Sequence, residues 1–213
     1  HSNEHYGNVA TYLRLKGIVP PSSDRAAVRT RLFYDQAHGE NGPPAEMTEI
    51  AARVGFSISV EAQEITPDAL KNTRVLYLRT PSKELSSAEK DAIVAFVKSG
   101  GSLLLVLDEE QRQSLATTGV NDLIEPFGMK ITPDTPYLHN CGAIAKAGEI
   151  NRADREIPYS GGRAVEGGTP FAYQLDRNGK AAQPFAAWKK IDNGGRIVVM
   201  AEGMASIFLG QKE

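Results

Sequence analysis

The sequence predicts an α/β protein with a doubly wound, mainly parallel, flavodoxin-like sheet that carries an antiparallel insertion. Three observations predict this fold: two short and almost wholly apolar runs, residues 74–78 and 102–107, and an amphipathic helix between them. Strands that are buried on both faces have continuous apolar sequences. A helix that joins two such strands is the repeating unit of a parallel sheet, and the connection is normally right-handed.

The connecting helix has recognisable ends. Ser86 and Glu89 have the spacing of a capping box, in which each side chain bonds the backbone of the other residue, so the helix is expected to begin there. Gly100 and Gly101 end it. One apolar face lies between these ends and is made of Ala92, Ile93, Phe96 and Val97.

The segments before this unit also have recognisable patterns. Residues 31–34 predict a first strand, and Pro43 and Pro44 precede an amphipathic helix that stops at Gly55. Residues 56–60 alternate as a second strand does, and residues 66–70 form a short capped turn.

Periodicity weakens in the second half of the chain. A helix is expected over residues 120–127 and a brief strand over 129–131; further candidate strands are Ile144, Ile150, 164–165, 171–175, 185–188 and 196–200. Residues 176–179 have the composition of a hairpin turn. We therefore expect residues 132–190 to form an irregular or antiparallel insertion within one α/β domain, residues 28–213, with residues 1–27 as an appendage.

Composition limits the classes of partner. The chain has 213 residues, 41% hydrophobic and 23% charged, with a net charge of -2, which gives no electrostatic case for a nucleic acid or an anionic membrane. No apolar run approaches the roughly 20 residues that span a bilayer. The single cysteine, Cys141, excludes an internal disulfide. Because the chain begins at His1, we expect a processed or trimmed start, and the compartment stays open, with an extracytoplasmic location slightly favoured over a cytoplasmic one.

Ligands of an open α/β sheet bind at the carboxyl ends of its strands. Residues that directly follow the expected strands are therefore the candidate ligand-binding residues: Asp35, Gln36, His38, Glu40, Thr80, Ser82, Asp108, Glu109 and Glu202. No catalytic residue is assigned.

The sequence lacks the nucleophile of the hydrolases that share this architecture. Such enzymes present Cys or Ser on a tight turn between a strand and a helix. Residues 102–107 lead instead into Asp108, Glu109 and Glu110, and no G-x-[CS]-x-G pattern is present. Cys141 lies near His139 in the irregular region, and we interpret it as an incidental cysteine.

The sequence also contains residues typical of metal and phosphate sites. A metal site would need Asp35, His38, Glu40, Asp108 and Glu202 to converge; no compact metal motif supports this, so we predict neither metal nor cofactor. The glycine-rich segment SGGRAVEGGTP does not lie between a strand and a helix, as a phosphate-binding loop does, and is predicted to be a flexible surface loop or hairpin.

Four segments resemble the GIFT-type domain shared by a gliding-motility auxiliary ABC-system protein and an intraflagellar-transport complex B subunit. They are TRLFYDQAHGEN, EITPDALKNTRVLYLRTPSKELSSAEKDAIVAFVKSGGSLLLVLDE, VNDLIEPFGMKIT and NGGRIVVMAEGMASIF. The resemblance implies a class I glutamine amidotransferase-like domain without the nucleophile, used for binding or scaffolding. Likeness to ThuA-like proteins further implies a sugar or glycan ligand, although Asp108 stands where the ThuA-like pattern has a histidine.

Two functions are expected from these observations. The first is a non-catalytic module that binds a small molecule, a glycan or another protein, in a crevice lined by Gln36, His38, Glu40, Thr80 and Asp108. The alternative is a hydrolase of the amidotransferase-like or ThuA-like group. It would use His38, Glu40 or His139 with Asp108, with or without a metal, because a carboxylate beside a histidine tunes acid–base chemistry near neutral pH.

Overall fold

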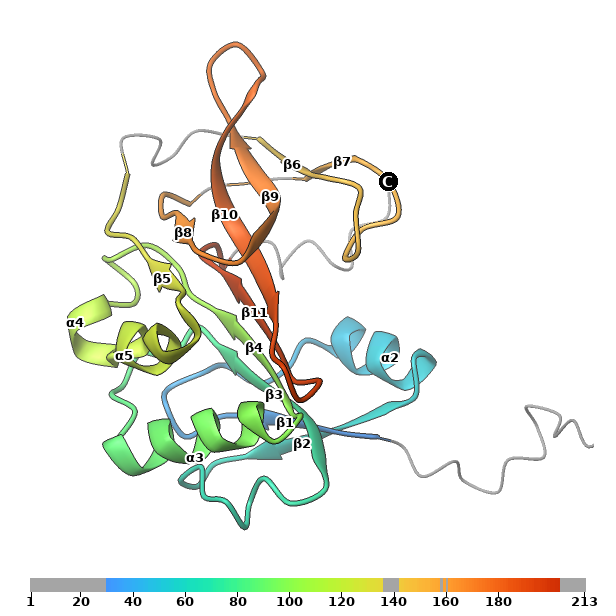
Figure 1. Cartoon of the computed structure of the whole chain (residues 1–213), viewed down its shortest axis with the longest axis vertical. Coiled ribbons are helices and arrows are strands. Elements are labelled where there is room, and N and C mark those ends of the chain that lie inside the picture. Colours follow the sequence, from blue (N-terminus) through green and yellow to red (C-terminus); the bar gives the residue numbers. More distant parts are fainter. Residues whose placement is uncertain (1–29, 136–141, 158, 160, 204–213) are drawn as a thin grey trace, which may run out of the picture.

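A computed structural model describes residues 30–135, 142–157, 159 and 161–203 of the chain. A nine-stranded sheet runs through the molecule in the order β2-β1-β3-β4-β11-β10-β9-β6-β7, and a second, two-stranded sheet lies beside it (Figure 1). The first five strands in this order are parallel to one another, and the remaining four are antiparallel. The predicted parallel sheet with an antiparallel insertion is therefore confirmed.

The parallel half consists of β2 (Phe56–Glu61), β1 (Thr30–Asp35), β3 (Thr73–Arg79), β4 (Ser102–Val106) and β11 (Arg196–Met200). β3 and β4 pair in register, so that Leu76 lies opposite Leu103 and Leu78 opposite Leu105. These four side chains are at most 1% exposed. Their burial explains why both segments have continuous apolar sequences.

Helices cover the parallel half on both faces, as Figure 1 shows. α2 (Ala45–Arg53) lies on one face. α3 (Ser87–Lys98), α4 (Leu115–Thr118), α5 (Val120–Ile124) and the 3-10 helix η2 (Glu125–Phe127) lie on the other. Successive residues of a strand point to opposite faces, and β3 follows this rule: Leu76 and Leu78 pack with α3 residues, whereas Tyr77 joins the cluster that includes Met47 of α2.

The predicted ends of α3 are confirmed. The Ser86 hydroxyl accepts from the Glu89 amide at 3.3 Å, and the Glu89 carboxylate accepts from the Ser86 amide at 2.9 Å. Gly100 follows the helix with a φ of 109°, which favours glycine. The capping box therefore places the carboxylate of Glu89 at a defined point beside the carboxyl ends of the strands.

The antiparallel half is built from β10 (Ala181–Lys190), β9 (Thr169–Leu175), β6 (Ala143–Ala145) and β7 (Arg155–Ile157). β9 and β10 form a long hairpin, turning at residues 176–179 as predicted, and it projects beyond the helices at the top of Figure 1. The small second sheet pairs β5 (Lys130–Ile131) with β8 (Val165–Glu166).

Several details differ from the sequence expectations. The helix expected over residues 120–127 is divided into α5 and η2, because Pro126 lacks the amide that would continue an α-helix. Ile150 lies in an irregular connection, and β7 was missed because Arg155 and Glu156 are polar and exposed. Cys141 and His139, and residues 1–27 assigned to the appendage, lie outside the described residues.

The glycine-rich segment around Arg163, predicted to be a flexible surface loop or hairpin, is buried over residues 161–165 and exposed over residues 166–170. Gly161, Arg163 and Ala164 are buried, and Arg163 is the largest fully buried side chain of the described chain. Gly167 lies so close to the Gly128 carbonyl that a Cβ atom would be 2.1 Å from its oxygen. The glycines therefore allow close packing of backbone on backbone.

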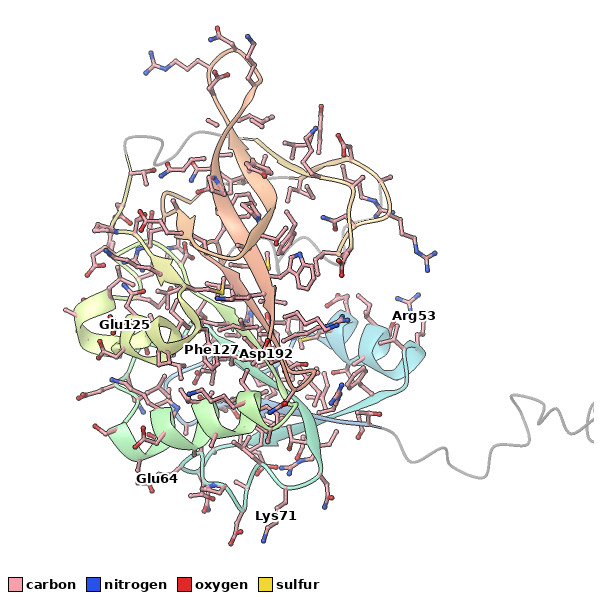
Figure 2. The ribbon with its side chains drawn as sticks, in the orientation of Figure 1. Arg53, Glu64, Lys71, Glu125, Phe127 and Asp192 are labelled. Atoms are coloured by element: carbon pink, nitrogen blue, oxygen red, sulfur yellow. The ribbon has the colours of Figure 1, made fainter. Side chains whose placement is uncertain are left out.

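Charged side chains cover the outside of the molecule. Figure 2 shows Arg53 at the end of α2, and Glu64 and Lys71 in the connection between β2 and β3, all of them exposed. Phe127, also labelled there, is 4% exposed. Within the described ranges, the helices are too short or too polar to cross a membrane.

Gly195 offers a test of this packing. A Cβ atom at this position would lie 2.1 Å from the Val97 carbonyl oxygen, where the end of α3 meets the start of β11. We expect Gly195→Ala to lower the free energy of unfolding by about 1–3 kcal/mol through steric overlap. The matched control is Gly148→Ala, because nothing lies within 4 Å of a Cβ there, and it should change stability by less than about 0.5 kcal/mol. Urea denaturation measures both, and equal effects would contradict the packing described.

Candidate functional site

Three buried side chains meet where β1 ends. Asp35 is the last residue of β1, and His38 and Glu40 follow in the next loop; they are 0%, 6% and 5% exposed. Ligand atoms of all three lie within 4.8 Å of one another. We call these three residues the β1-loop cluster. Asp35 is held in position by the end of β1. A tight turn at Gly39, with a φ of 88°, brings Glu40 back toward Asp35.

The imidazole of His38 lies between two carboxylates. Its Nδ1 is 2.7 Å from Oδ2 of Asp35, and its Nε2 is 3.2 Å from Oε1 of Glu89. Carboxylates only accept hydrogen bonds, so the ring donates through both nitrogens, which is the protonated form of histidine. Burial alone would lower the pKa of His38, but the bonds to Asp35 and Glu89 outweigh burial and raise it.

Glu89 was interpreted from the sequence only as a helix cap. Its carboxylate also accepts from the Ile65 amide at 3.0 Å and from the Ser86 hydroxyl at 2.8 Å. Burial opposes ionisation, but these donors together with His38 lower the pKa of Glu89 overall. Sequence reasoning missed this role because only the fold brings residue 89 beside the β1 loop. The sequence did offer one indication: a capping box uses only one carboxylate oxygen of Glu89, so the other oxygen is available for a second partner.

Glu40 has the opposite environment. Neither of its carboxylate oxygens has a hydrogen-bond partner. Burial, followed by the neighbouring Asp35 carboxylate, raises the pKa of Glu40 to about 9, against a smaller opposing effect of the backbone at Glu40 and His38. An isolated buried carboxyl group keeps its proton at neutral pH. No hydrogen bond to another residue is formed by the Glu40 oxygens in the ordinary geometry, and its retained proton faces the Asp35 carboxylate.

A groove of about 600 Å³ borders this cluster. Its wall is formed by Ala37, His38, Ala62, Gln63, Glu64, Lys83, Glu84, Ser86 and Glu89. His38 is thus the one predicted ligand residue on the wall of this groove. The wall differs from the expected crevice, which also included Gln36, Glu40, Thr80 and Asp108.

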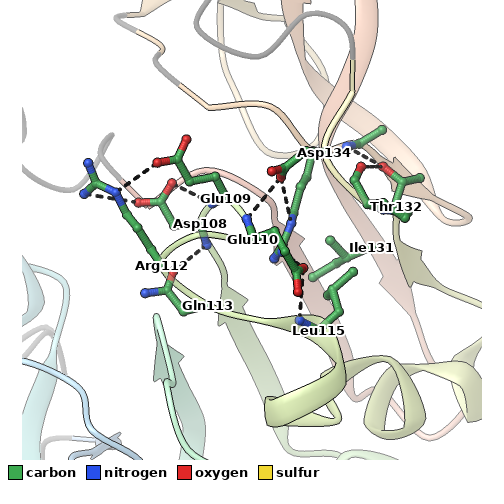
Figure 3. A network of polar contacts seen from close by, with 12 residues as sticks. Asp108, Glu109, Glu110, Arg112, Gln113, Leu115, Ile131, Thr132 and Asp134 are labelled. Atoms are coloured by element: carbon green, nitrogen blue, oxygen red, sulfur yellow. Dashed lines mark hydrogen bonds and ion pairs between the residues drawn. The ribbon is translucent and has the colours of Figure 1, made fainter.

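A second group of charges lies beyond β4, shown in Figure 3. Asp108 accepts from the Glu109 amide at 2.9 Å, and the Asp108 amide donates to Oε1 of Gln113 at 3.0 Å. Arg112 pairs with Glu109 at 3.3 Å and reaches Asp108 at 3.8 Å. Burial raises the pKa of Asp108, and the Glu109 amide and Arg112 partly oppose it. Asp108 and Glu109 are thus engaged in holding their own loop.

Arg163 anchors the far side of this second group. Its guanidinium pairs with Glu110 and, at 3.3 Å, with Asp134. Glu110 also accepts from the Leu115 amide, and the Glu110 amide donates to Asp134 (Figure 3). A buried arginine needs such partners, because an unpaired buried charge costs several kcal/mol. The ion pairs of Arg163 therefore connect the antiparallel half to the loop after β4.

The remaining predicted residues have separate positions. Gln36 is exposed. Ser82 donates its amide to the His38 carbonyl at 2.8 Å, so it supports the β1 loop. Thr80 and Asp108 both approach Gly203: a Cβ atom there would lie 2.9 Å from Cγ2 of Thr80 and 3.0 Å from Oδ2 of Asp108. Glu202 is buried close to Gly161.

The structure therefore brings together only part of the expected metal set. Asp35, His38 and Glu40 form a group with metal-ligand donors; Asp108 and Glu202 are not members of it. The hydrolase alternative paired a histidine with Asp108, and Asp108 does not belong to the group that contains His38. Ligand binding by the nine predicted residues stays a prediction.

The environment of Glu40 predicts how stability depends on pH. A carboxyl group whose pKa is raised on folding holds its proton more tightly in the folded state, so its contribution to stability is lost as pH rises from about 4.5 to about 9. Glu40→Gln keeps the shape without the ionisable group. In a buffer with a chelator, it should be more stable than the parent protein by a few kcal/mol at pH 8, and the difference should shrink toward pH 4.5. Urea unfolding at both values measures this; a difference that does not change with pH would contradict it.

A comparison with protein families gives one match: the family described as the IFT52 GIFT domain, over residues 45–153. This segment covers about half of the chain. Curated relatives include intraflagellar transport protein 52 homologs. The mouse protein is 28% identical over 122 residues, and the human protein 26%. Each alignment covers 54% of this chain and only 28% or 27% of the relative, so the chain corresponds to little more than a quarter of their length.

These relatives correct the expectation about compartment. An extracytoplasmic location was slightly favoured from the sequence, but the relatives are named for transport inside a flagellum. That expectation was wrong. Neither the single cysteine nor the residue at which the sequence begins settles the compartment.

Solved structures show the same fold. The mmIFT52 N-terminal domain superposes with a TM-score of 0.65 at 17% identity, covering 83% of this chain and 87% of that one. A protein from Thermoplasma acidophilum that is described as part of a GMP synthase gives a TM-score of 0.51 at 9% identity, covering 82% and 83%. The amidotransferase-like architecture follows from these superpositions. The match of the family model over residues 45–153 shows that this chain belongs to the IFT52 GIFT domain family.

Proposed function

We propose that this domain is a non-catalytic module that binds another protein within an assembly of the intraflagellar-transport kind. The relatives' names support a partner of this class. The observation that carries the proposal is the outer edge of β2. Among the described strands, β2 pairs only with β1, so the other side of its backbone is open.

The direction of the open backbone groups follows from the hydrogen bonds of β1. Thr30 donates to the Gly55 carbonyl, and Gln36 donates to the Glu61 carbonyl. In a parallel pair, alternate residues of a strand bond the same neighbour. The odd-numbered residues of β2 therefore face β1. The amide and carbonyl groups that face outward are those of Phe56, Ile58 and Val60.

Few features of β2 would prevent another strand from pairing with its open edge. Proteins commonly shield an edge strand with lysine, proline or a bulge. β2 contains neither lysine nor proline, and its one charged side chain, Glu61, pairs with Arg31 at 2.7 Å. Val54 and Val60 are 66% and 45% exposed beside it. An extended peptide from a partner would add a strand here, with main-chain bonds for affinity and apolar contacts for selectivity.

The rest of the chain supports a scaffold role. We propose that residues 28–213 form one domain, since one sheet takes its strands from residues 30 to 200, and that residues 1–27 are an appendage. No contact among the described side chains favours a glycan or a small molecule over a protein, so those ligands stay predictions.

The β2 edge can be tested by crosslinking. A photo-crosslinking amino acid at Val60 of the full chain, in extract of the source cells, should give a discrete adduct with another protein. The control position is Glu149, which is exposed and far along the chain in the antiparallel half. The adduct at Val60 identifies the partner, which is then purified for binding measurements.

Two substitutions decide whether the backbone edge does the binding. Ile58→Pro removes an outward amide but leaves the ladder with β1 intact. Ile58→Ala loses the side chain and keeps the amide. Affinity for the purified partner should fall about fivefold more for Ile58→Pro, since the one lost main-chain hydrogen bond is worth about 1 kcal/mol. Equal affinities for the two variants, or equal crosslinking at Val60 and Glu149, would refute edge pairing.

A further inference from the structure

We propose that Asp35, His38 and Glu40 bind a divalent transition-metal cation, and that Glu89 positions His38 for it. This site lies at the β1 loop and is separate from the β2 edge, so its test does not depend on the partner proposal. The chemical class follows from the donors. Two carboxylates and one imidazole suit borderline cations such as Zn²⁺ and Mn²⁺.

The distances between the donors fit a small cation. The three ligand atoms lie within 4.8 Å of one another. Zinc binds oxygen and nitrogen at about 2.0–2.2 Å, so two of its ligands can be at most about 4.4 Å apart. A rotation that moves one carboxylate by a few tenths of an ångström brings the set into this range.

The unpartnered carboxylate of Glu40 is the independent sign of a missing ligand. Glu40 is 5% exposed, and neither oxygen has a hydrogen-bond partner. Buried polar groups without partners are rare, and each one needs an explanation, such as an ion at the site. A cation between Glu40, Asp35 and His38 would satisfy both carboxylates and balance their charge.

Glu89 orients the imidazole in the way that metal-bound histidines are oriented. A histidine that binds a metal through one nitrogen usually donates the other N–H to a carboxylate, which fixes the tautomer and the ring plane. Here Nε2 is 3.2 Å from Oε1 of Glu89. Nδ1 faces Asp35 at 2.7 Å, so a cation would be bound by Nδ1 in place of that hydrogen bond.

The loop that carries His38 and Glu40 is held rigidly. The His38 carbonyl accepts from the amides of Ser82 and Lys83, at 2.8 and 3.1 Å. Gly39 leaves no room for a side chain, because a Cβ atom would be 2.2 Å from Oγ of Ser82. A loop fixed in this way keeps donors in place before a ligand arrives, which favours binding.

The wall of the groove beside His38 includes Glu89, the partner of Nε2, but neither Asp35 nor Glu40. The titratable groups of that groove are Glu64, Lys83, Glu84 and Glu89. Three protein ligands leave a position for water or another ligand, as in the open zinc sites of enzymes.

The test uses the full chain after removal of metal with a chelator. Calorimetric titration with Zn²⁺ should give one equivalent bound, with affinity at least about tenfold lower in Asp35→Asn and Glu40→Gln. Glu89→Gln should weaken binding by about 10- to 100-fold, as expected for a residue that orients a ligand. Asp108→Asn is the matched control, because it alters a buried carboxylate outside the cluster and should bind as the parent protein does.

Spectroscopy of the parent protein covers the case in which a variant fails to fold. Co²⁺ added to the metal-free protein should give the visible absorption of a site with nitrogen and oxygen ligands, without a thiolate charge-transfer band. This readout separates the site from any binding at Cys141. A thiolate band, absence of Zn²⁺ and Mn²⁺ binding at tens of micromolar, or unchanged binding in folded Asp35→Asn and Glu40→Gln would overturn the proposal.

Discussion

The buried carboxylate of Glu89 connects three segments that are distant in the sequence. It accepts from Ser86 at the start of α3, from Ile65 in the connection after β2, and from His38 in the loop after β1. A carboxylate in a poorly hydrated place is tolerated only when its oxygens have such partners. The first turn of α3 and the β1 loop therefore have to be in place together. That requirement fixes the position of His38 after the carboxyl end of β1.

The carboxyl edge of the sheet contains two groups of charges with different character. Around Asp108, Glu110 and Arg163, the charged groups form ion pairs with one another and bonds with backbone amides, although Nη1 of Arg163 has no hydrogen-bond partner. This group joins the antiparallel half to the parallel sheet. In the β1-loop cluster, Glu40 has no partner and the groove lies beside His38. The first group explains how the insertion is attached. The second group contains carboxylate and imidazole atoms that a cation could bind.

Physical reasons decide which features could be predicted from the sequence. The β3–α3–β4 unit was predicted because burial on both faces and a capping box are local patterns. The β1-loop residues were predicted because strand ends share one edge of a parallel sheet. Glu89 and Arg163 were missed or misinterpreted because their roles depend on partners far along the chain: His38, Glu110 and Asp134. Spacing within a loop does not show which distant carboxylate a buried charge will meet.

The central claim is that the imidazole of His38 is held between Asp35 and Glu89. A pH titration of the metal-free protein by long-range ¹H–¹⁵N NMR tests it most directly, because the two ring nitrogens report their protonation separately. We expect N–H groups on both nitrogens at neutral pH and a pKa above the ordinary value of about 6.5. A neutral ring at pH 7 with a pKa at or below that value would contradict it.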